Sequence, residues 1–366
     1  MKLRLNRELL LKPLQLIGNI VERRPTMAIL SNILVQVKNN SLTLTGTDLE
    51  VEMVTSFMVD SNDTEEITLP GRKFIDICKA LPVDAEIEIE TEGTRATIRS
   101  GRSRFTLSTL PATEFPNIDP ITSPLKFSIK QNDLKHLIEK TQFCMAQQDV
   151  RYYLNGLMLE IAKTSINAVA TDGHRLAISK ISGEYPVTET RQIIIPRKGV
   201  TELLRLLEEN DGLIQIKLSE NHIRIDMDGL SFTSKLIDGK FPDYKQVIPE
   251  ICDKQVICNR EILKQAFARA SVLSNEKYRG IRLNFSNNAL KATVHNPEQE
   301  EAEENIEVNY SGNEMEIGFN VAYFLEALSV INEQNVILNM TDTNHSCLVQ
   351  GEANTSNRYV IMPMRL

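Results

Sequence analysis

The sequence predicts an α+β protein made of three similar repeats, each with two helices and antiparallel sheets. The first indication is length, because 366 residues exceed the size at which one hydrophobic core usually stops growing. The second is an internal repeat of about 124 residues. The third is a period-two alternation of apolar and polar residues, which is typical of antiparallel sheets with one buried face.

Short motifs carry the repeat. Asp48, Asp172 and Asn296 are equally spaced along the chain. Leu69-Pro70-Gly71-Arg72-Lys73 is echoed by Ile195-Pro196-Arg197-Lys198-Gly199, and two of the repeats close on Phe-Pro, at Phe115-Pro116 and Phe241-Pro242. Asp119-Pro120 and Pro249-Glu250 interrupt the pattern. We therefore expect domains at residues 1–120, 121–250 and 251–366.

Within each repeat we expect a helix, hairpins, a second helix and further hairpins. Asn6, Asn132 and Asn259 are predicted to cap the three opening helices, because a short side-chain oxygen can accept from unpaired backbone amides. Pro13 is expected to kink the first helix. Alternation predicts hairpins around two turns, with inward-facing positions Ile214, Ile216, Leu218, Ile223, Ile225 and Met227, and Ile281, Leu283, Phe285, Leu290, Ala292 and Val294.

Composition narrows the class of protein. No apolar run is long enough for a membrane-spanning helix, and the N-terminus lacks a secretory signal. The five cysteines form no CxxC pair, which favours a reducing compartment and small core residues rather than ligands. We therefore expect a cytoplasmic protein without a metal or cofactor. The net charge of -8 requires any nucleic-acid binding to come from a local basic face.

The predicted helices are basic. On the five helices other than the last we count thirteen basic against eight acidic residues. If these helices line one concave surface, that surface attracts phosphate while the outer surface repels it. For any single residue, the alternative is an ordinary solvated helix face. The basic residues are Arg7, Lys12, Arg72, Lys73, Lys79, Lys135, Lys140, Arg197, Lys198, Arg205, Arg260, Lys264 and Arg269.

The two ends of the chain carry opposite charge. A basic cluster closes the first repeat, and an acidic run lies in the third. Such segregation favours head-to-tail association, which closes into a ring when its rotation permits. The alternative is a solvated acidic loop. The clusters are Arg95, Arg99, Arg102 and Arg104, and Glu298, Glu300, Glu301, Glu303 and Glu304.

Several motifs resemble the bacterial DNA sliding clamp, the beta subunit of DNA polymerase III, over essentially the whole chain. They are Gly46-Thr47-Asp48-Leu49-Glu50, Ser100-Gly101-Arg102-Ser103-Arg104-Phe105, Asp149-Val150-Arg151-Tyr152-Tyr153-Leu154-Asn155-Gly156, Ala170-Thr171-Asp172-Gly173-His174-Arg175-Leu176, Ser274-Asn275-Glu276-Lys277 and Val360-Ile361-Met362-Pro363-Met364-Arg365-Leu366. The resemblance implies a non-catalytic DNA clamp fold of three domains per chain. It implies a homodimeric ring that slides on duplex DNA and tethers replication enzymes.

The resemblance also implies functional residues on three surfaces. By the resemblance DNA would contact Arg24, Gln148, Tyr152 and Tyr153. The charge of the helices adds the cations Arg72, Lys79, Arg197, Lys198, Arg205, Lys264 and Arg269 as expected DNA contacts. In the dimer, Lys73, Arg95, Arg102, Arg104 and Leu107 would face Val272, Leu273 and the acidic run from Glu298 to Glu304. For the paired tyrosines, the alternative is a half-buried packing site.

The third surface is a hydrophobic pocket for a short peptide of the clamp loader, the replicative polymerase and repair or translesion factors. Aliphatic and methionine side chains would make it adaptable to different peptides. Position 246 is Gln where the best-known members carry Arg, which questions one polar contact at the rim. The matching residues are Leu154, Thr171, Gly173, His174, Arg175, Leu176, Pro242, Val247, Ser346, Val360, Ile361, Met362, Pro363, Met364 and Arg365.

Two other classes of function stay open on the residues alone. A hydrolase could use Asp172 and His174, although the sequence shows no phosphate loop, HExxH or GxSxG motif and supplies no nucleophile beside that pair. A peptide-binding scaffold that never meets DNA is the other alternative. Turnover by the purified protein would identify the enzyme, and retention on circular DNA would separate the clamp from the scaffold.

Overall fold

The computed structural model describes residues 2–22, 26–61, 63–116, 125–249 and 252–365. The chain forms two compact units, Met1–Asn132 with Lys198–Leu236 (unit 1), and Asp133–Arg197 with Ile237–Leu366 (unit 2). Each unit therefore combines strands from two neighbouring sequence repeats. The expected breaks at Asp119-Pro120 and Glu250 fall outside the described residues, so the domain bounds stay a prediction.

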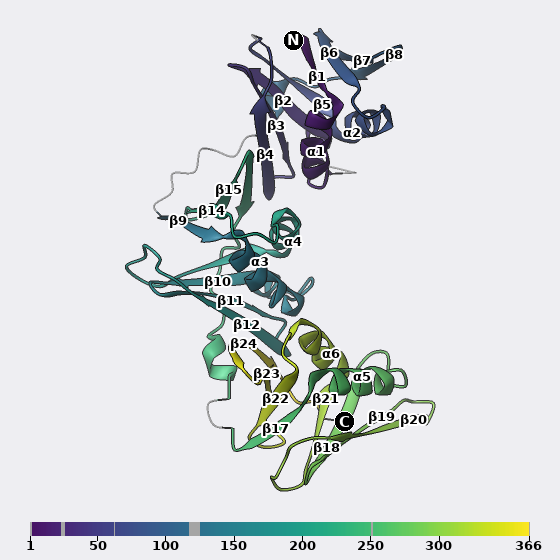
Figure 1. Ribbon diagram of the computed structural model, residues 1–366, viewed down its shortest axis with the longest axis vertical. Coiled ribbons are helices and arrows are strands. Elements are labelled where there is room, and N and C mark those ends of the chain that lie inside the picture. Colours follow the sequence, from purple (N-terminus) through teal and green to yellow (C-terminus); the bar gives the residue numbers. More distant parts are fainter. Residues whose placement is uncertain (1, 23–25, 62, 117–124, 250–251, 366) are drawn as a thin grey trace. The chain divides into compact units, whose positions relative to one another are not determined.

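Unit 1 contains an eight-stranded antiparallel sheet in the order β5-β2-β3-β4-β16-β15-β14-β9 (Figure 1). The pairing of β4 with β16, in which Val51 lies opposite Ser234, joins the first and second repeats in this one sheet. Its strands are β2 (Asn32–Lys38), β3 (Ser41–Thr47), β4 (Val51–Met58), β5 (Glu65–Pro70), β9 (Leu125–Lys130), β14 (Leu213–Leu218), β15 (His222–Met227) and β16 (Leu230–Lys235).

A second sheet of unit 1, in the order β1-β6-β7-β8, lies beside two helices that pack on each other. Leu10, Leu14 and Ile17 of the first helix and Phe74 and Cys78 of the second are buried, as period-3.6 spacing of apolar residues requires. The elements are β1 (Lys2–Asn6), β6 (Glu86–Glu92), β7 (Arg95–Ser100), β8 (Ser103–Ser108), α1 (Arg7–Gly18) and α2 (Gly71–Ala80). Unit 1 also contains most of α4 (Arg197–Leu206), which comes from the second repeat.

Unit 2 repeats this plan with an eight-stranded sheet in the order β13-β10-β11-β12-β24-β23-β22-β17. Pairing of β12 with β24, from Arg175 opposite Ile361 to Ser179 opposite Asn357, joins the second and third repeats. The strands are β10 (Gly156–Ala162), β11 (Ser165–Thr171), β12 (Arg175–Ser182), β13 (Arg191–Pro196), β17 (Lys254–Asn259), β22 (Asn335–Met340), β23 (Cys347–Gly351) and β24 (Asn354–Ile361).

The remaining sheet of unit 2 has the order β20-β19-β18-β21 and packs against α5 and α6 (Figure 1). The Phe324 ring of α6 meets the rings of Phe267 and Phe319 edge to face, with centroid distances of 5.5 and 5.1 Å respectively. Because Phe267 lies on α5 and Phe319 on β21, these contacts fix the two helices on the sheet. The elements are α5 (Arg260–Ser271), α6 (Val321–Val330), β18 (Gly280–Ser286), β19 (Ala289–His295), β20 (Glu301–Glu307) and β21 (Met315–Asn320). Unit 2 also contains most of α3 (Gln131–Glu139), which comes from the second repeat. Short 3₁₀ helices span Ala28–Ser31, Ala112–Glu114, Gln142–Cys144, Tyr152–Leu154 and Tyr244–Val247.

The predicted hairpins are confirmed. β18 pairs with β19 and β14 with β15, and the alternating positions are buried except Met227, which is half-buried. The acidic run is not a loop throughout, because Glu301, Glu303 and Glu304 lie on β20. α1 continues through Pro13 as one helix.

Two of the three predicted helix caps are confirmed. The Asn6 side chain accepts from the Glu8 amide, and Asn259 accepts from the amides of Glu261 and Ile262. The prediction for Asn132 was wrong, because α3 begins at Gln131 and Asn132 is its second residue. Here the strand runs into the helix without an asparagine between them, so the equivalent position is Lys130.

Candidate functional site

Unit 2 contains a hollow of about 170 Å³ between β11, β12, the C-terminal segment and the segment 241–247. Its floor belongs to a buried apolar cluster that includes Leu154, Leu176, Phe241 and Val360. An apolar floor with polar groups only at the rim suits an inserted hydrophobic side chain. The lining residues are Arg151, Leu154, Thr171, Gly173, Arg175, Leu176, Phe241, Pro242, Asp243, Tyr244, Val247, Val360 and Met362.

The turn between β11 and β12 forms one rim of this pocket. The Thr171 hydroxyl donates to the Arg175 carbonyl and accepts from the Gly173 amide, while Asp172 Oδ1 accepts from the amides of His174 and Arg175. Gly173 has a φ of +87°, and a Cβ there would lie 2.8 Å from Arg151 Nη2. The positive φ favours glycine, and any larger residue would also make the Arg151 guanidinium shift.

The first repeat folds the equivalent residues in the same way. Thr47 donates to the Val51 carbonyl and accepts from the Leu49 amide, and Asp48 Oδ1 accepts from the amides of Glu50 and Val51. Leu49, with a φ of +75°, stands where the second repeat has glycine. The recurring Thr-Asp pair is thus the sequence signature of a turn, and it gives Asp172 a structural role rather than that of a catalytic base.

Arg175 holds the turn to the third repeat. Its Nε donates to Asp172 Oδ2 at 3.0 Å, Nη1 to Glu326 at 2.8 Å and Nη2 to the Phe143 carbonyl at 2.8 Å. The guanidinium also lies over the rings of Phe143 and Tyr323, 5.5 and 4.6 Å from their centroids. Only 11% of the side chain is exposed, so these contacts satisfy a nearly buried charge.

The opposite wall is anchored by a buried carboxylate. Glu160 of β10 accepts from the Tyr244 hydroxyl at 2.9 Å, from Gln192 at 2.9 Å and from Asn167 at 3.0 Å. Burial acts to raise the pKa of Glu160, but hydrogen bonds from Gln192, Asn167 and Tyr244 outweigh it, so the pKa lies below its ordinary value. Burial and the neighbouring carboxylate raise the pKa of Tyr244. Tyr244 is therefore a neutral donor in a fixed position.

The C-terminal segment separates this pocket from a second hollow. The Met362 amide donates to the His174 carbonyl at 3.0 Å, and the Met364 amide donates to the Gly318 carbonyl at 2.8 Å. Met362 lines the pocket, whereas Met364 and Arg365 line the second hollow, whose volume is about 430 Å³.

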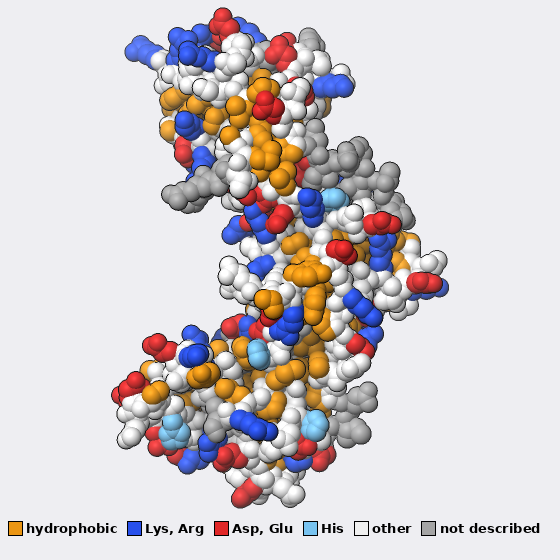
Figure 2. Space-filling view, turned by 180° about the vertical axis from the view of Figure 1, so that it is seen from behind, with side chains coloured by type: hydrophobic (Ala, Val, Ile, Leu, Met, Phe, Trp, Pro, Cys, Tyr) orange, Lys and Arg blue, Asp and Glu red, His pale blue; other side chains and the backbone are white. Residues whose placement is uncertain are grey.

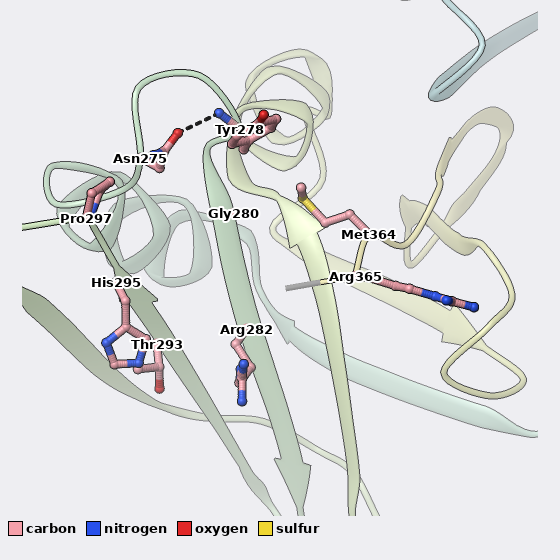
Figure 3. Close-up of a pocket in the computed structure, with 9 residues that line it drawn as sticks. All are labelled: Asn275, Tyr278, Gly280, Arg282, Thr293, His295, Pro297, Met364 and Arg365. Atoms are coloured by element: carbon pink, nitrogen blue, oxygen red, sulfur yellow. Dashed lines mark hydrogen bonds between the residues drawn. The ribbon is translucent and has the colours of Figure 1, made fainter. Parts of the chain in front are cut away.

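The second hollow lies on the strands β18 and β19 (Figure 3). Met364 points toward Tyr278, but the Arg365 side chain extends away from the other lining residues (Figure 3). Arg282 is held by Glu316 at 3.0 Å, and His295 lies 3.8 Å from Glu301. Of the two arginines that line this hollow, Arg282 is therefore engaged by Glu316 and Arg365 is directed elsewhere.

Nine of the fifteen residues predicted for the peptide site line the first pocket. His174 lies on the rim turn, Ser346 precedes β23, and Ile361 is buried in β24 between β12 and β23. Pro363 lies between the two hollows, and Met364 and Arg365 belong to the second. Four further residues line the pocket but were not predicted as pocket residues from the sequence: Arg151, Phe241, Asp243 and Tyr244. Phe241 had been noted only as part of the repeated Phe-Pro motif.

The residues predicted to contact DNA differ in exposure and in whether an ion pair already engages them. Gln148 and Tyr152 are exposed and Tyr153 is half-buried against the pocket cluster, while Arg24 is outside the described residues. Arg72 and Lys79 are exposed, Lys264 is half-buried, and none of the three makes an ion pair with a described residue. These three cations are available to a ligand.

Four other predicted DNA contacts are engaged within the chain. Arg197 donates to the carbonyls of Met145 and Ala146. Lys198 pairs with the buried Asp48, and Arg205 pairs with Glu202 at 2.6 Å. Arg269 forms a bidentate pair with Glu304, at 2.8 and 2.7 Å. The positive charge of the helices is thus partly neutralised, which a count of cations cannot reveal.

Some of the predicted dimer residues lie on two edge strands, Arg104 and Leu107 on β8 and Glu301, Glu303 and Glu304 on β20. β8 ends one sheet of unit 1 and β20 ends one sheet of unit 2. Lys73, Arg95, Arg102 and Arg104 are exposed without an ion pair to any described residue, and basic side chains gather at this end of unit 1 (Figure 2). Leu107 is 8% exposed, Val272 is 78% exposed and Leu273 is half-buried.

The acidic edge is partly paired within its own chain. Glu303 lies 2.7 Å from Lys291, and Glu304 is the partner of Arg269. Glu300 accepts from the Asn296 side chain, whereas Glu298 is exposed. The edge therefore keeps an excess of negative charge.

No group of three or more His, Cys, Asp or Glu side chains within the described ranges could hold a metal ion. Cys78, Cys144, Cys258 and Cys347 are buried, and burial raises the pKa of each thiol. None of the helices in the described part of the chain is long and apolar enough to cross a membrane.

The chain matches one known protein family along its whole length. The DNA polymerase III beta subunit matches in all three parts, with its N-terminal domain at residues 1–119, its central domain at 128–243 and its C-terminal domain at 245–365. The beta sliding clamp of Pseudomonas aeruginosa is 52% identical over 99% of both chains, and that of Escherichia coli K12 is 50% identical over 100% of both.

Solved structures agree with these matches. The DNA polymerase III subunit beta of Pseudomonas aeruginosa covers 100% of both chains at 51% identity, with a TM-score of 0.97. A clamp from the same organism, bound to griselimycin, has a TM-score of 0.96 at 51% identity. The fold is the three-domain clamp fold, α+β in class. The chain belongs to the family of DNA polymerase III beta subunits.

Proposed function

We propose that the protein is a non-catalytic sliding clamp. Two chains would join head to tail around duplex DNA in the bacterial cytoplasm and tether the replicative polymerase and other DNA-processing proteins. The observation that carries this proposal is family membership across all three domains, at about half identity to proteins named beta sliding clamp. Retention would come from closure of the ring rather than from tight binding.

The available cations suit a surface that slides. Arg72 and Lys79 on α2 and Lys264 on α5 offer charges to phosphate without a carboxylate partner among the described residues. Phosphate contacts carry no base sequence and weaken with salt, so a few of them hold DNA without fixing its register. Gln148, which precedes the 3₁₀ helix Tyr152–Leu154, and Tyr152, which begins it, add exposed polar and aromatic groups.

The edge strands suit a head-to-tail seam. The unpaired edge of β8 can extend a sheet onto the edge of β20 of a second chain, with basic residues meeting acidic ones. Exposed ion pairs contribute about 0–1 kcal/mol each, so strand pairing and burial of Val272 would supply most of the affinity. Charge would set orientation and encounter rate.

The first pocket suits a peptide from the clamp loader, polymerase or repair factors. Its buried aliphatic and aromatic floor can accept an apolar side chain, and its walls are fixed by Arg175 on one side and Glu160 on the other. Fixed walls reduce the entropy lost on binding.

Retention on DNA tests the proposal. After loading onto nicked circular DNA, the protein should stay bound in high salt and be lost when the DNA is linearised. Equal loss from both forms would refute encirclement and favour a scaffold that does not enclose DNA. Native mass measurement should give a dimer, and the double variant Arg102→Glu with Arg104→Glu should shift it toward monomer. Hydrolytic turnover by the purified chain would instead support the enzyme alternative.

A further inference from the structure

One cation of α5 is bound to the edge strand β20. Arg269 lies in the last turn of α5, and Glu304 lies on β20, which ends its sheet. Arg269 Nε donates to Glu304 Oε1 at 2.8 Å, and Nη2 donates to Oε2 at 2.7 Å. A single guanidinium therefore engages both oxygens of the carboxylate, in the bidentate geometry that makes arginine pairs strong and specific.

The two faces of β20 carry different acids. α5 packs against β20 (Figure 1), and the buried Ile306 and the half-buried Glu304 lie on that face, because the side chains of a strand alternate. Glu303 lies on the opposite face, where it pairs with Lys291 of β19 at 2.7 Å. Glu304 is therefore the acid of β20 whose charge is offset by a helix cation, on the side of the sheet that the helix covers.

The two members of this pair differ in exposure. The Arg269 side chain is 60% exposed, whereas that of Glu304 is 22% exposed. Arg269 can therefore turn to an anion in solvent, but Glu304 without a cation would keep a partly buried, uncompensated charge. Val272, which follows α5 and is 78% exposed, is a predicted dimer residue. The pair thus lies between a helix predicted to contact DNA and the predicted seam.

We infer that Arg269 couples DNA binding to closure of the ring through an exchange of ion pairs. In the DNA-free chain Arg269 holds Glu304 and so weakens the attraction of β20 for a second chain. A DNA phosphate that takes Arg269 frees Glu304 for an arginine on the basic edge of that second chain. Arg102 and Arg104 are exposed there without an ion pair to any described residue. This inference rests on the proposed clamp function.

Two electrostatic effects act in the same direction. Loss of the Arg269 charge from the seam removes its repulsion of the incoming arginine, and it leaves Glu304 to attract that arginine. One exposed ion pair changes an affinity by up to about fivefold. A head-to-tail ring of two chains has two equal seams, so we expect a combined change of about three- to tenfold. Because linkage is reciprocal, the dimer should bind phosphate more tightly than the monomer by the same factor.

Dimer dissociation of the full-length chain tests the inference. Chains labelled with donor or acceptor fluorophores are mixed and diluted, and energy transfer gives the dissociation constant. Arg269→Gln should lower that constant about three- to tenfold in low-salt buffer without DNA, because Glu304 is then already free. A short duplex DNA should lower the constant of the unaltered chain by a larger factor than that of Arg269→Gln, and high salt should remove this difference.

Two further variants make the test specific. Glu304→Gln removes the acid that the exchange frees, so adding it to Arg269→Gln should cancel the gain in affinity. Arg282→Gln breaks a matched pair with Glu316, which is 3.0 Å long and reaches β21 at the other edge of the same sheet, and it should leave the dissociation constant unchanged.

Two results would overturn the inference and leave the clamp intact. One is a dissociation constant of Arg269→Gln equal to or above that of the unaltered chain, and the other is an equal effect of DNA on both. A chain that stays monomeric at every concentration would refute the ring and the inference with it.

Discussion

Replacing Arg175 should destabilise unit 2 more than any other change at the pocket rim. Arg175→Ala removes three hydrogen bonds and two ring contacts and leaves the Phe143 carbonyl and Asp172 without their partner. Breaking a buried ion pair costs about 3–5 kcal/mol. Because the side chain of Glu326 is 46% exposed, water recovers part of that contact, and we expect about 3 kcal/mol.

Thermal unfolding measures this effect. A loss of about 3 kcal/mol lowers the melting temperature of a unit of this size by about 6–12 °C. Arg175→Lys keeps the charge but cannot make the three bonds, so it should lose about half as much. Arg151→Ala is the matched control, because its side chain is 47% exposed and paired on the surface, and it should cost under about 1 kcal/mol. A melting temperature for Arg175→Ala within 2 °C of the unaltered protein, roughly the shift of one weak contact, would refute this account.

Further predictions concern caps, titration and thiols. Asn259→Ala should cost about 1 kcal/mol in thermal unfolding, whereas Asn132→Ala, which removes no cap, should cost less than about 0.5 kcal/mol. Burial acts to raise the pKa of Asp226, but hydrogen bonds from its lysine, serine and arginine neighbours hold it at about 2, below its ordinary 3.8. Its contribution to stability is therefore present above about pH 4 and is lost as the pH falls toward 2. In Asp226→Asn, the melting temperature should consequently fall less steeply with pH over that range. In the native protein, thiol reagents should modify Cys252 alone, and Cys144 only after unfolding, as counted by mass.

Local periodicity was enough to predict much of the fold. The hairpins around Asn288 and Asn221 follow from side chains that alternate between two faces, a property of each strand by itself. The cap at Asn132 failed because the helix begins where β9 ends, and no residue type marks that point. The pairing of β12 with β24 was not predictable, because it joins residues far apart in the chain.

The candidate site was predictable where a motif recurs and not where buried partners decide. Asp172 was visible through the repeat, and Thr171 and Gly173 were predicted from the resemblance to the clamp family. Asp243 and Tyr244 were not, because their positions depend on Gln246 and Glu160, and a buried carboxylate looks like any other acid in a sequence. Counting helix cations overstated the basic surface because Lys198 and Arg269 pair with Asp48 and Glu304, two acids that lie outside the helices.

The two shared sheets have a consequence for pieces of the chain. β4 with β16, and β12 with β24, are ladders of backbone hydrogen bonds across the junctions between successive repeats. A fragment cut near residue 250 would lack β24 and leave β12 as a bare, largely apolar border. Such a fragment should aggregate rather than fold, so the triplicated chain cannot be dissected into self-sufficient modules even though its sequence is modular.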